Sequence, residues 1–229
     1  MQTDHGREPH GRDQRETVTP FPIPARIPVF PLPNVVLFPK TYLPLHIFEP
    51  RYREMVREAV AGHQCIGMAL LKDGWEANYY GNPPLYPIGC VGRLVSVQPL
   101  PDGRFAILLL GLERCLIEES FYDRSYREAR IALKPDLPGE ALPTSLRAEV
   151  ERLLSESPQP QQQRRGWLEV LRAGVADDIL VNSLASLLDL TPIEKQFLLE
   201  AETLHQRSRR LCDLIHFKQH ERADAKGWG

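Results

Sequence analysis

Few residues of this chain have the types and spacing that chemistry requires. His46 and Glu49 lie close enough in sequence to form an acid/base pair, but nothing near them supplies a nucleophile. The chain also lacks the GxxxxGK[ST] loop that cradles phosphates, the GxSxG and HExxH hydrolase motifs and the GxGxxG dinucleotide fingerprint. We therefore expect a structural role for His46 and Glu49 and no enzymatic activity.

The cysteines are spaced too widely for a metal site. They form no CxxC pair, and no histidine stands at zinc-ligand spacing. The first three fall in or beside apolar segments, where a reduced thiol behaves as a small hydrophobic group. The sequence predicts buried thiols, no metal and no cofactor; the cysteines are Cys65, Cys90, Cys115 and Cys212.

The charge balance is close to neutral. Lys and Arg number 28 against 30 Asp and Glu, a net charge of -2, which gives no general attraction for nucleic acid or for an anionic membrane. Arg207, Arg209 and Arg210 could contact RNA. The same predicted helix also carries acidic side chains, which favour a solvated face of mixed charge; they are Glu200, Glu202 and Asp213.

Neither a membrane span nor a signal peptide is evident. The longest apolar run, Phe105 to Leu112, is far shorter than the roughly 20 residues that cross a bilayer. The opening MQTDHGREPHGRDQRE carries charges of both signs and lacks an apolar core. We expect a cytoplasmic protein with no membrane partner.

Proline dominates the stretch IPVFPLPNVVLFPKTYLPLHIFEPRY, from Ile27 to Tyr52. Proline removes a backbone donor and fixes φ, so this stretch predicts short strands that meet at tight corners. A helix should begin at Pro50 and stop at Gly62. Its apolar face repeats with helical spacing; it consists of Tyr52, Met55, Val56, Ala59 and Val60.

Two strand-like runs flank Pro101-Asp102-Gly103, whose residue types are typical of a hairpin turn. We expect Gly111 to break the second run and Tyr126 to Leu133 to form a further strand. About six to eight short strands separated by turn residues favour a closed or nearly closed antiparallel barrel. Asp73 to Pro87 reads as a long loop.

Past Lys134-Pro135 the apolar period changes to that of helices. Short helices are expected near Leu146 to Leu154, near Trp167 to Leu171 and from a cap at Asp177 or Asp178. Thr191-Pro192-Ile193-Glu194 has the pattern of a capping box, and one helix should run from there to about residue 218.

These patterns divide the chain into a β-rich and a helical domain. The fold class is α+β. We expect a disordered tail over 1–25, a β-barrel domain with one inserted helix over 26–138, a helical bundle with one long terminal helix over 139–220, and a tail over 221–229.

Several segments resemble the amino-terminal, substrate-binding domain of the ATP-dependent Lon proteases. They are PVFPLPNVVLFPKTYLPLHIFEPRY, IGCVGRLVSVQPLPDGRFAILLLGLERCLI, YREARIAL and IEKQFLLEAETLHQRSRRLCDLI, within about residues 26 to 217. The resemblance implies a PUA-like barrel followed by a helical bundle. In full-length members this region is thought to recognise protein substrates and to help assembly, while separate domains hydrolyse ATP and cleave peptides.

We expect a non-catalytic polypeptide-binding module that captures apolar segments on the barrel surface or between barrel and bundle, with strand addition at an open edge. Its partners would be unfolded or client polypeptides, together with a protease or a chaperone. The alternatives are an RNA-binding PUA-like protein and an enzyme of unrecognised type. Candidate contact residues, each of which could instead fill the core, are Phe38, Pro39, Tyr42, Leu43, Tyr79 and Tyr80.

Overall fold

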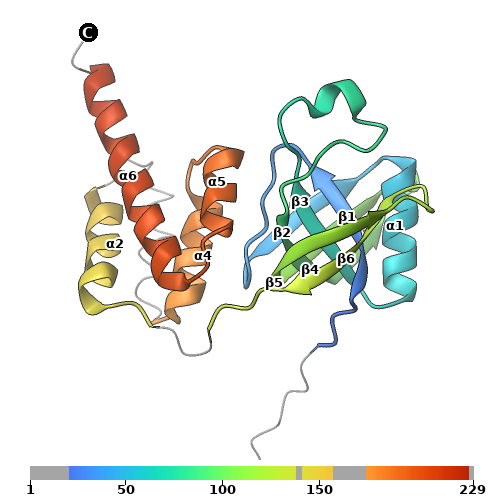
Figure 1. Ribbon diagram of the computed structural model, residues 1–229, viewed down its shortest axis with the longest axis horizontal. Helices are drawn as coiled ribbons and strands as arrows, with labels where there is room; N and C mark the ends of the chain where they lie inside the picture. Colours follow the sequence, from blue (N-terminus) through green and yellow to red (C-terminus); the bar gives the residue numbers. More distant parts are fainter. Residues whose placement is uncertain (1–20, 138–140, 157–173, 227–229) are drawn as a thin grey trace, which may run out of the picture.

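The computed structural model describes residues 21–137, 141–156 and 174–226. A sheet region, residues 26–133, precedes a helical region, residues 144–226, and the two lie side by side (Figure 1). The helix predicted at Trp167 to Leu171 lies outside the described residues, as do residues 1–20 and 227–229 of the two expected tails. Phe21 and Ile23, expected in the tail, instead pack on the sheet.

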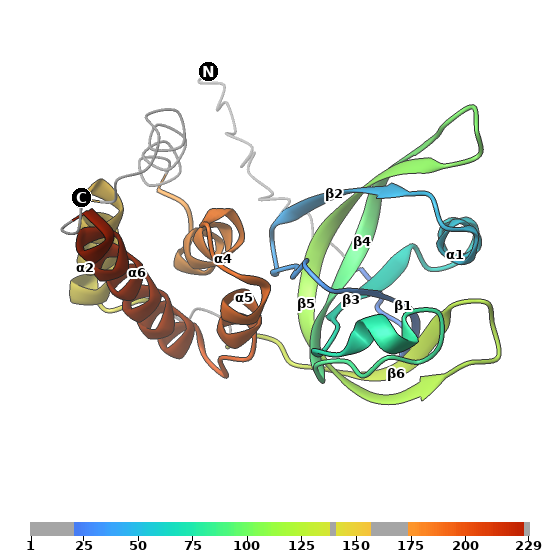
Figure 2. The same cartoon turned by 90° about the horizontal axis from the view of Figure 1, so that it is seen from above.

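The strands form one six-stranded sheet in the order β2-β5-β4-β3-β1-β6. A further pairing joins β5 to β6, so five of the strands close on themselves, as Figure 2 shows from above. The long strand β5 makes this possible because it pairs with three neighbours. The strands are β1 (Arg26–Leu32), β2 (Tyr42–Ile47), β3 (Cys65–Leu70), β4 (Ile88–Pro99), β5 (Phe105–Phe121) and β6 (Arg127–Leu133).

The expectation of a purely antiparallel sheet was wrong for one pair. Strands β1 and β3 run parallel, with Val29 opposite Gly67. Between them the chain passes through β2 and a helix, and a connection of this length can return the chain in the same direction, which a tight hairpin cannot.

Helix α1 (Pro50–Ala61) confirms the helix predicted after the proline-rich stretch. It begins with proline and ends at Gly62, as expected. Its buried face packs on the sheet; the buried residues are Tyr52, Met55, Val56 and Ala59. The following loop, residues 71–87, contains the short 3-10 helix η1 (Trp75–Asn78).

The β4–β5 hairpin is also confirmed. Gly103 has a φ of 80°, and Asp102 accepts a hydrogen bond from the backbone of Arg104 at 3.1 Å. Gly111, however, does not break the second run, because β5 continues through it to Phe121. A Cβ at this position would lie 2.1 Å from the carbonyl oxygen of Phe38. Gly111 therefore permits a close approach of two backbones rather than ending a strand.

The helical region contains α2 (Thr144–Glu156), α4 (Asp177–Leu187), α5 (Pro192–Leu199) and α6 (Leu204–Lys226). The capping box is confirmed, with Glu194 N donating to Thr191 Oγ1 at 3.2 Å and Thr191 N donating to Glu194 Oε2 at 2.6 Å. The N-cap position of α4 is occupied by Ala176, and neither Asp177 nor Asp178 caps this helix as expected. None of the helices in the described ranges is long and apolar enough to cross a membrane.

The expectation of a single helix from residue 192 to about 218 was wrong. The chain breaks between α5 and α6, and α6 continues through the expected C-terminal tail to Lys226. The two helices pack against each other and, with α2 and α4, against the side chains of Val36, Phe38 and Leu70 from the sheet region. The two regions therefore share one hydrophobic cluster.

Candidate functional site

The six predicted contact residues lie in three separate places. Phe38 and Pro39 lie where the sheet and helical regions meet, Tyr42 and Leu43 lie on strand β2, and Tyr79 and Tyr80 follow η1. The sequence predicted all six as contact residues, but the structure does not bring them together into one site.

A cavity of about 410 Å³, here called the junction groove, lies between the two regions. Residues from both regions line it, among them Pro39, Glu113 and Asp178. Phe38 is 0% exposed and belongs to the shared core, so it is not available for a surface contact. Of the two residues predicted here, only Pro39 borders the groove.

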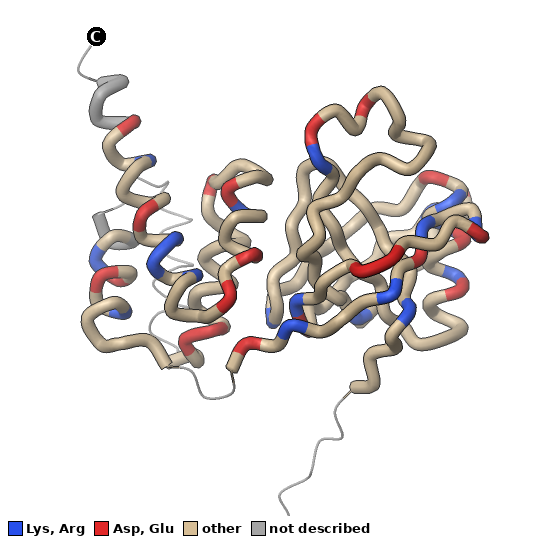
Figure 3. The backbone as a smooth tube through the Cα atoms, in the orientation of Figure 1, with Lys and Arg blue, Asp and Glu red and all other residues tan. Residues whose placement is uncertain are grey.

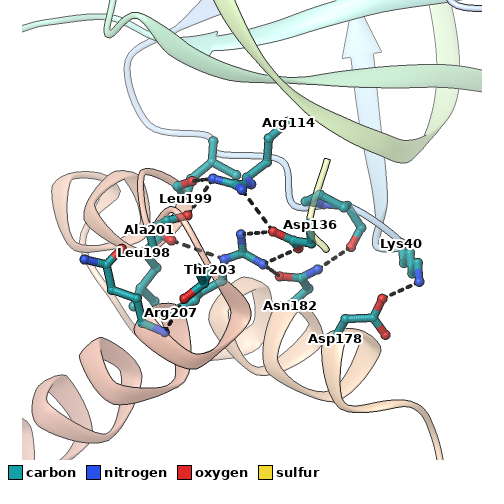
Figure 4. Close-up of polar contacts among 12 residues, drawn as sticks. Lys40, Arg114, Asp136, Asp178, Asn182, Leu198, Leu199, Ala201, Thr203 and Arg207 are labelled. Atoms are coloured by element: carbon teal, nitrogen blue, oxygen red, sulfur yellow. Dashed lines mark hydrogen bonds and ion pairs between the residues drawn. The ribbon is translucent and has the colours of Figure 1, made fainter. Parts of the chain in front are cut away.

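Buried arginines hold the junction together (Figure 4). Arg114, on β5, donates to the carbonyl oxygens of Leu199, Ala201 and Glu202 at 3.3, 2.5 and 3.2 Å. These carbonyls lie at the end of α5 and in the turn after it, where a helix leaves acceptors without partners. Arg114 therefore stabilises the break that divides the predicted long helix.

The prediction of a solvated, mixed-charge helix face was wrong for Arg207, which is buried. Its side chain is 0% exposed, and it bonds the carboxylate of Asp136 and, at 3.0 Å, Oδ1 of Asn182. Asn182 in turn donates to the carbonyl oxygen of Pro39 at 3.1 Å. This chain of contacts links α6, α4 and the sheet region, so Arg207 serves the fold and is not available to RNA.

The electrostatics of the junction follow from its burial. Burial alone would raise the pKa of Asp136, but hydrogen bonds from Arg207 and Arg114 and their charges outweigh burial and lower that pKa. Nearer the surface, Lys40 pairs with Asp178 across the groove. Lys40, Asp136, Asp178 and Asn182 around the groove are thus engaged with protein partners, which is the pattern of a structural interface.

Strand β2 pairs only with β5 among the described strands, so its second edge is open. Tyr42 is 61% exposed there, and Leu43 packs partly against the sheet core. Pro44 lies in the middle of the strand and has no N–H, and prolines of this kind protect sheet edges from further pairing. The edge is therefore less suited to strand addition than the sequence suggested.

The third place is a cavity of about 280 Å³, here called the arginine–tyrosine pocket. Its lining comes from α1, the η1 loop and the β5–β6 turn. Tyr79 is half-buried and Tyr80 is 85% exposed, with ring centroids 5.1 Å apart. The lining residues used below are Arg51, Tyr52, Tyr79, Tyr80, Tyr122, Arg124, Tyr126 and Arg127.

Arg51 organises one wall of this pocket. Its guanidinium carbon lies 4.5, 4.9 and 5.6 Å from the ring centroids of Tyr52, Tyr79 and Tyr80, within cation–π distance. Glu49 accepts from Arg51 Nε at 3.1 Å and from the Tyr79 hydroxyl at 2.5 Å. His46 is exposed and is not among these partners, so the two residues do not form an acid/base pair.

The opposite wall was missed by sequence reasoning. Arg127, on β6, donates to the carbonyl oxygen of Pro83 at 2.9 Å and lies 5.2 Å from the Tyr122 ring. Arg124 and Tyr126 both bond Glu58 of α1, at 3.1 and 2.6 Å. A signal was present in the adjacent pairs Arg51-Tyr52 and Tyr126-Arg127, but nothing local indicates that they meet.

The pocket offers binding groups rather than reactive ones. The lining residues within the described ranges include no histidine, cysteine or lysine, and Ser125 donates to Glu54 at 2.8 Å. No group of three potential metal ligands occurs among the residues that the structure describes. Cys65, Cys90 and Cys115 are buried, as predicted, and Cys212 is buried as well. The arrangement can bind an anion or an aromatic group by charge and stacking.

Comparison with known proteins places this fold in a family. The family model described as the ATP-dependent protease La (LON) substrate-binding domain matches residues 26–216. The chain belongs to this family.

Two solved structures agree in fold. The Lon N-terminal domain protein from Xanthomonas campestris has a TM-score of 0.60 and 25% identity, covering 81% of this chain and 96% of that one. The N-terminal domain of a Mycobacterium avium complex Lon protease has a TM-score of 0.62 and 18% identity, covering 83% and 98%.

The curated relatives of this family member are full-length proteases. Lon protease of Anaeromyxobacter dehalogenans is 28% identical over 206 residues, which are 86% of this chain and 24% of the relative. Lon protease 1 of Herpetosiphon aurantiacus is 32% identical over 123 residues, 52% of this chain and 15% of the relative. The chain thus spans about a quarter of the length of the first of these relatives.

Proposed function

We propose that this chain is a non-catalytic polypeptide-binding module that recognises exposed segments of client proteins. The observation that carries the proposal is the match of the LON substrate-binding family model to residues 26–216, nearly all of the residues in the sheet and helical regions. With it we propose the division into a PUA-like barrel domain, 26–138, and a helical bundle, 139–220.

The surface that we assign to clients surrounds Tyr79 and Tyr80. Tyr80 projects almost all of its side chain into solvent, and Tyr122, on the far side of the same pocket, is about half exposed. Large aromatic side chains that remain exposed next to a cavity are typical of recognition surfaces, because they bury much area at little cost in side-chain entropy. Pro39 in the junction groove and Tyr42 with Leu43 on β2 are secondary contact candidates.

Binding would use the pocket for one client residue and the tyrosine rings for its neighbours. An extended segment presents alternating side chains, so one can enter a pocket while the adjacent ones lie on the surrounding surface. We propose that a separate protease or chaperone acts on the captured client, and that the module works in the cytoplasm.

RNA binding is the alternative function. The cations and rings around Arg51 favour it, because stacking platforms with arginine are common in single-strand binding. Along the described chain, however, acidic and basic residues are interspersed on both regions (Figure 3), and no long segment carries one sign. Arg207, the first residue of the predicted basic cluster, is buried. We therefore rank polypeptide binding first.

A titration tests the proposal. A fluorescein-labelled model protein that is kept unfolded would be titrated with the purified chain and followed by fluorescence anisotropy, with the folded form of the same protein as the control. Saturable binding of the unfolded form at micromolar concentrations, weaker for the folded form, is expected. A lack of saturation up to about 100 μM would mean an affinity too weak for transient recognition of this kind, and it would count against polypeptide binding.

A further inference from the structure

Arg127 is a buried cation without a counter-ion. The residue is 8% exposed, and none of the described residues brings a carboxylate within ion-pair distance of it. Burial lowers the pKa of Arg127, and the positive charge of Arg51 also lowers it. A buried charge without a partner destabilises the fold, so its presence here indicates a role beyond folding.

The other two arginines of the arginine–tyrosine pocket are already neutralised. Arg51 pairs with Glu49 at 3.0 Å, and Arg124 pairs with Glu58 at 3.1 Å. The lining residues themselves include no Asp or Glu. The pocket therefore carries an excess of about one positive charge, all of it at Arg127.

Hydrogen-bond donors remain unused at the same place. Arg127 uses Nη2 for the carbonyl oxygen of Pro83, and its other guanidinium nitrogens have no partner among the described residues. The Tyr52 hydroxyl also makes no hydrogen bond within the described part of the chain, whereas Nη2 of Arg51 lies 3.0 Å from Oε2 of Glu49. Arg127 and Tyr52 line one cavity, and its other polar lining comes from four tyrosines and from Arg51, Arg124, Asn82 and Ser125.

We propose that the arginine–tyrosine pocket binds a single carboxylate group carried by a polypeptide, with Arg127 as its counter-ion and the Tyr52 hydroxyl as a further donor. This inference rests on the proposed function. Guanidinium groups bind carboxylates through paired N–H donors, and the first turn of α1, which carries Arg51 and Tyr52, adds the positive end of a helix dipole.

The charge and size of the pocket select a carboxylate over a phosphate. One uncompensated cation matches a monoanion, whereas a phosphate dianion would face Glu49 and Glu58 behind Arg51 and Arg124. A volume of about 280 Å³ lies just below the range for small-ligand pockets, about 300–1,000 Å³. It fits one residue of a chain, with the exposed rings of Tyr80 and Tyr122 beside the rest of the segment.

The test uses three short peptides and NMR of the full chain. Acetyl-Ala-Ala-Leu with a free carboxyl end, the same peptide as its amide, and acetyl-Ala-Asp-Ala-amide would each be titrated into ¹⁵N-labelled protein. The Nε–H signals of Arg51 and Arg127 report the pocket directly. The first peptide carries an α-carboxylate, the third a side-chain carboxylate and the second neither, so the comparison also identifies the source of the group.

The expected result is a saturable shift of both arginine signals with at least one of the two carboxylate peptides and at least tenfold weaker binding of the amide. Arg127→Gln should weaken carboxylate binding at least tenfold. Arg130→Gln, which removes an exposed and ion-paired arginine from the same strand, should not. Arg127→Lys keeps the charge but loses the paired donors, so its affinity for the carboxylate peptides should lie between those of the wild type and of Arg127→Gln.

Equal binding of acid and amide would overturn the assignment, as would stronger binding of inorganic phosphate or of an RNA oligonucleotide than of the carboxylate peptides. Unchanged carboxylate binding in folded Arg127→Gln would do the same. The unfolded-client titration is read separately. If the wild-type chain binds clients and ignores carboxylates, only this inference fails; if it binds no client at all, the proposed function fails.

Discussion

Arg207 and Asp136 form a two-point ion pair between α6 and the segment that follows β6. Arg207 Nη1 lies 2.8 Å from Asp136 Oδ2, and Arg207 Nη2 lies 3.0 Å from Asp136 Oδ1. Arg114 Nη2 donates to the same Oδ1 at 2.9 Å. A single carboxylate thus pairs with two buried guanidinium groups that come from different regions of the fold.

Asp136→Asn should destabilise the protein by about 3 kcal/mol, because it leaves two buried arginine charges without a counter-ion. Urea unfolding, followed by circular dichroism, measures the change. Glu202→Gln is the matched control, since Glu202 is an exposed carboxylate that pairs with Lys134, and it should change the unfolding midpoint little. Equal effects of the two substitutions would show that Asp136 does not hold the junction.

The same carboxylate predicts a pH dependence. The pKa of Asp136 is lowered in the folded protein, whereas the unfolded chain has a pKa of about 3.9. The stabilisation is therefore complete above about pH 5 and is lost as the pH falls through the lowered folded value. The difference in unfolding free energy between the wild type and Asp136→Asn should shrink from pH 6 to pH 3. A constant difference would contradict the lowered pKa.

Gly111→Ala should cost about 1–3 kcal/mol, because the new Cβ would lie 2.1 Å from a backbone oxygen that cannot move without displacing the chain. Gly67→Ala is the comparison. It also lies in a strand, but its closest neighbour, at 3.0 Å, is the end of the Ile27 side chain, which can adjust. Thermal unfolding should show the larger loss for Gly111→Ala, and the reverse order would refute the close approach.

The thiols should be unreactive in the folded protein. Burial raises the pKa of Cys65 to about 11 and those of Cys115 and Cys212 to about 12, and it raises that of Cys90 well above the ordinary value. At pH 8 a thiol reagent such as dithionitrobenzoate should label the unfolded chain within minutes and the native chain only as fast as it opens. Rapid labelling of any native cysteine would show that its burial is incomplete.

Local signals accounted for the elements that the sequence predicted well. The Pro101-Asp102-Gly103 turn and the capping box at Thr191 depend on residues within a few positions of one another, so the pattern alone is sufficient. Helix α1 followed in the same way from its apolar spacing and from Pro50 and Gly62. Each of these features depends on residues that are close together in the sequence.

Features that depend on distant partners were not predictable. Arg207 stands in a helix of mixed charge, and only Asp136, 71 positions away, makes its burial favourable. The division between α5 and α6 likewise depends on Arg114, which lies 85 positions from Leu199. The parallel pairing of β1 with β3 depends on the path of the intervening chain rather than on either strand.

The candidate site was predicted only in part. Aromatic content in a long loop was enough to select Tyr79 and Tyr80, and both line the arginine–tyrosine pocket. Arg127 is adjacent to Tyr126 in a segment that reads as an ordinary alternating strand, so nothing in its neighbourhood suggests a buried cation. Its convergence with Arg51 arises only when the β5–β6 turn meets α1 and the η1 loop.

The most direct test of polypeptide recognition compares the wild type with the double variant Tyr79→Ala/Tyr80→Ala in the anisotropy titration with an unfolded protein. Phe217→Ala is the matched control, because Phe217 is a similarly exposed aromatic residue on α6, away from the pocket. We predict saturable micromolar binding for the wild type and the control, and at least tenfold weaker binding for a folded double variant. Binding of equal strength by all three proteins would contradict the assigned surface, and no binding by the wild type would contradict the function itself.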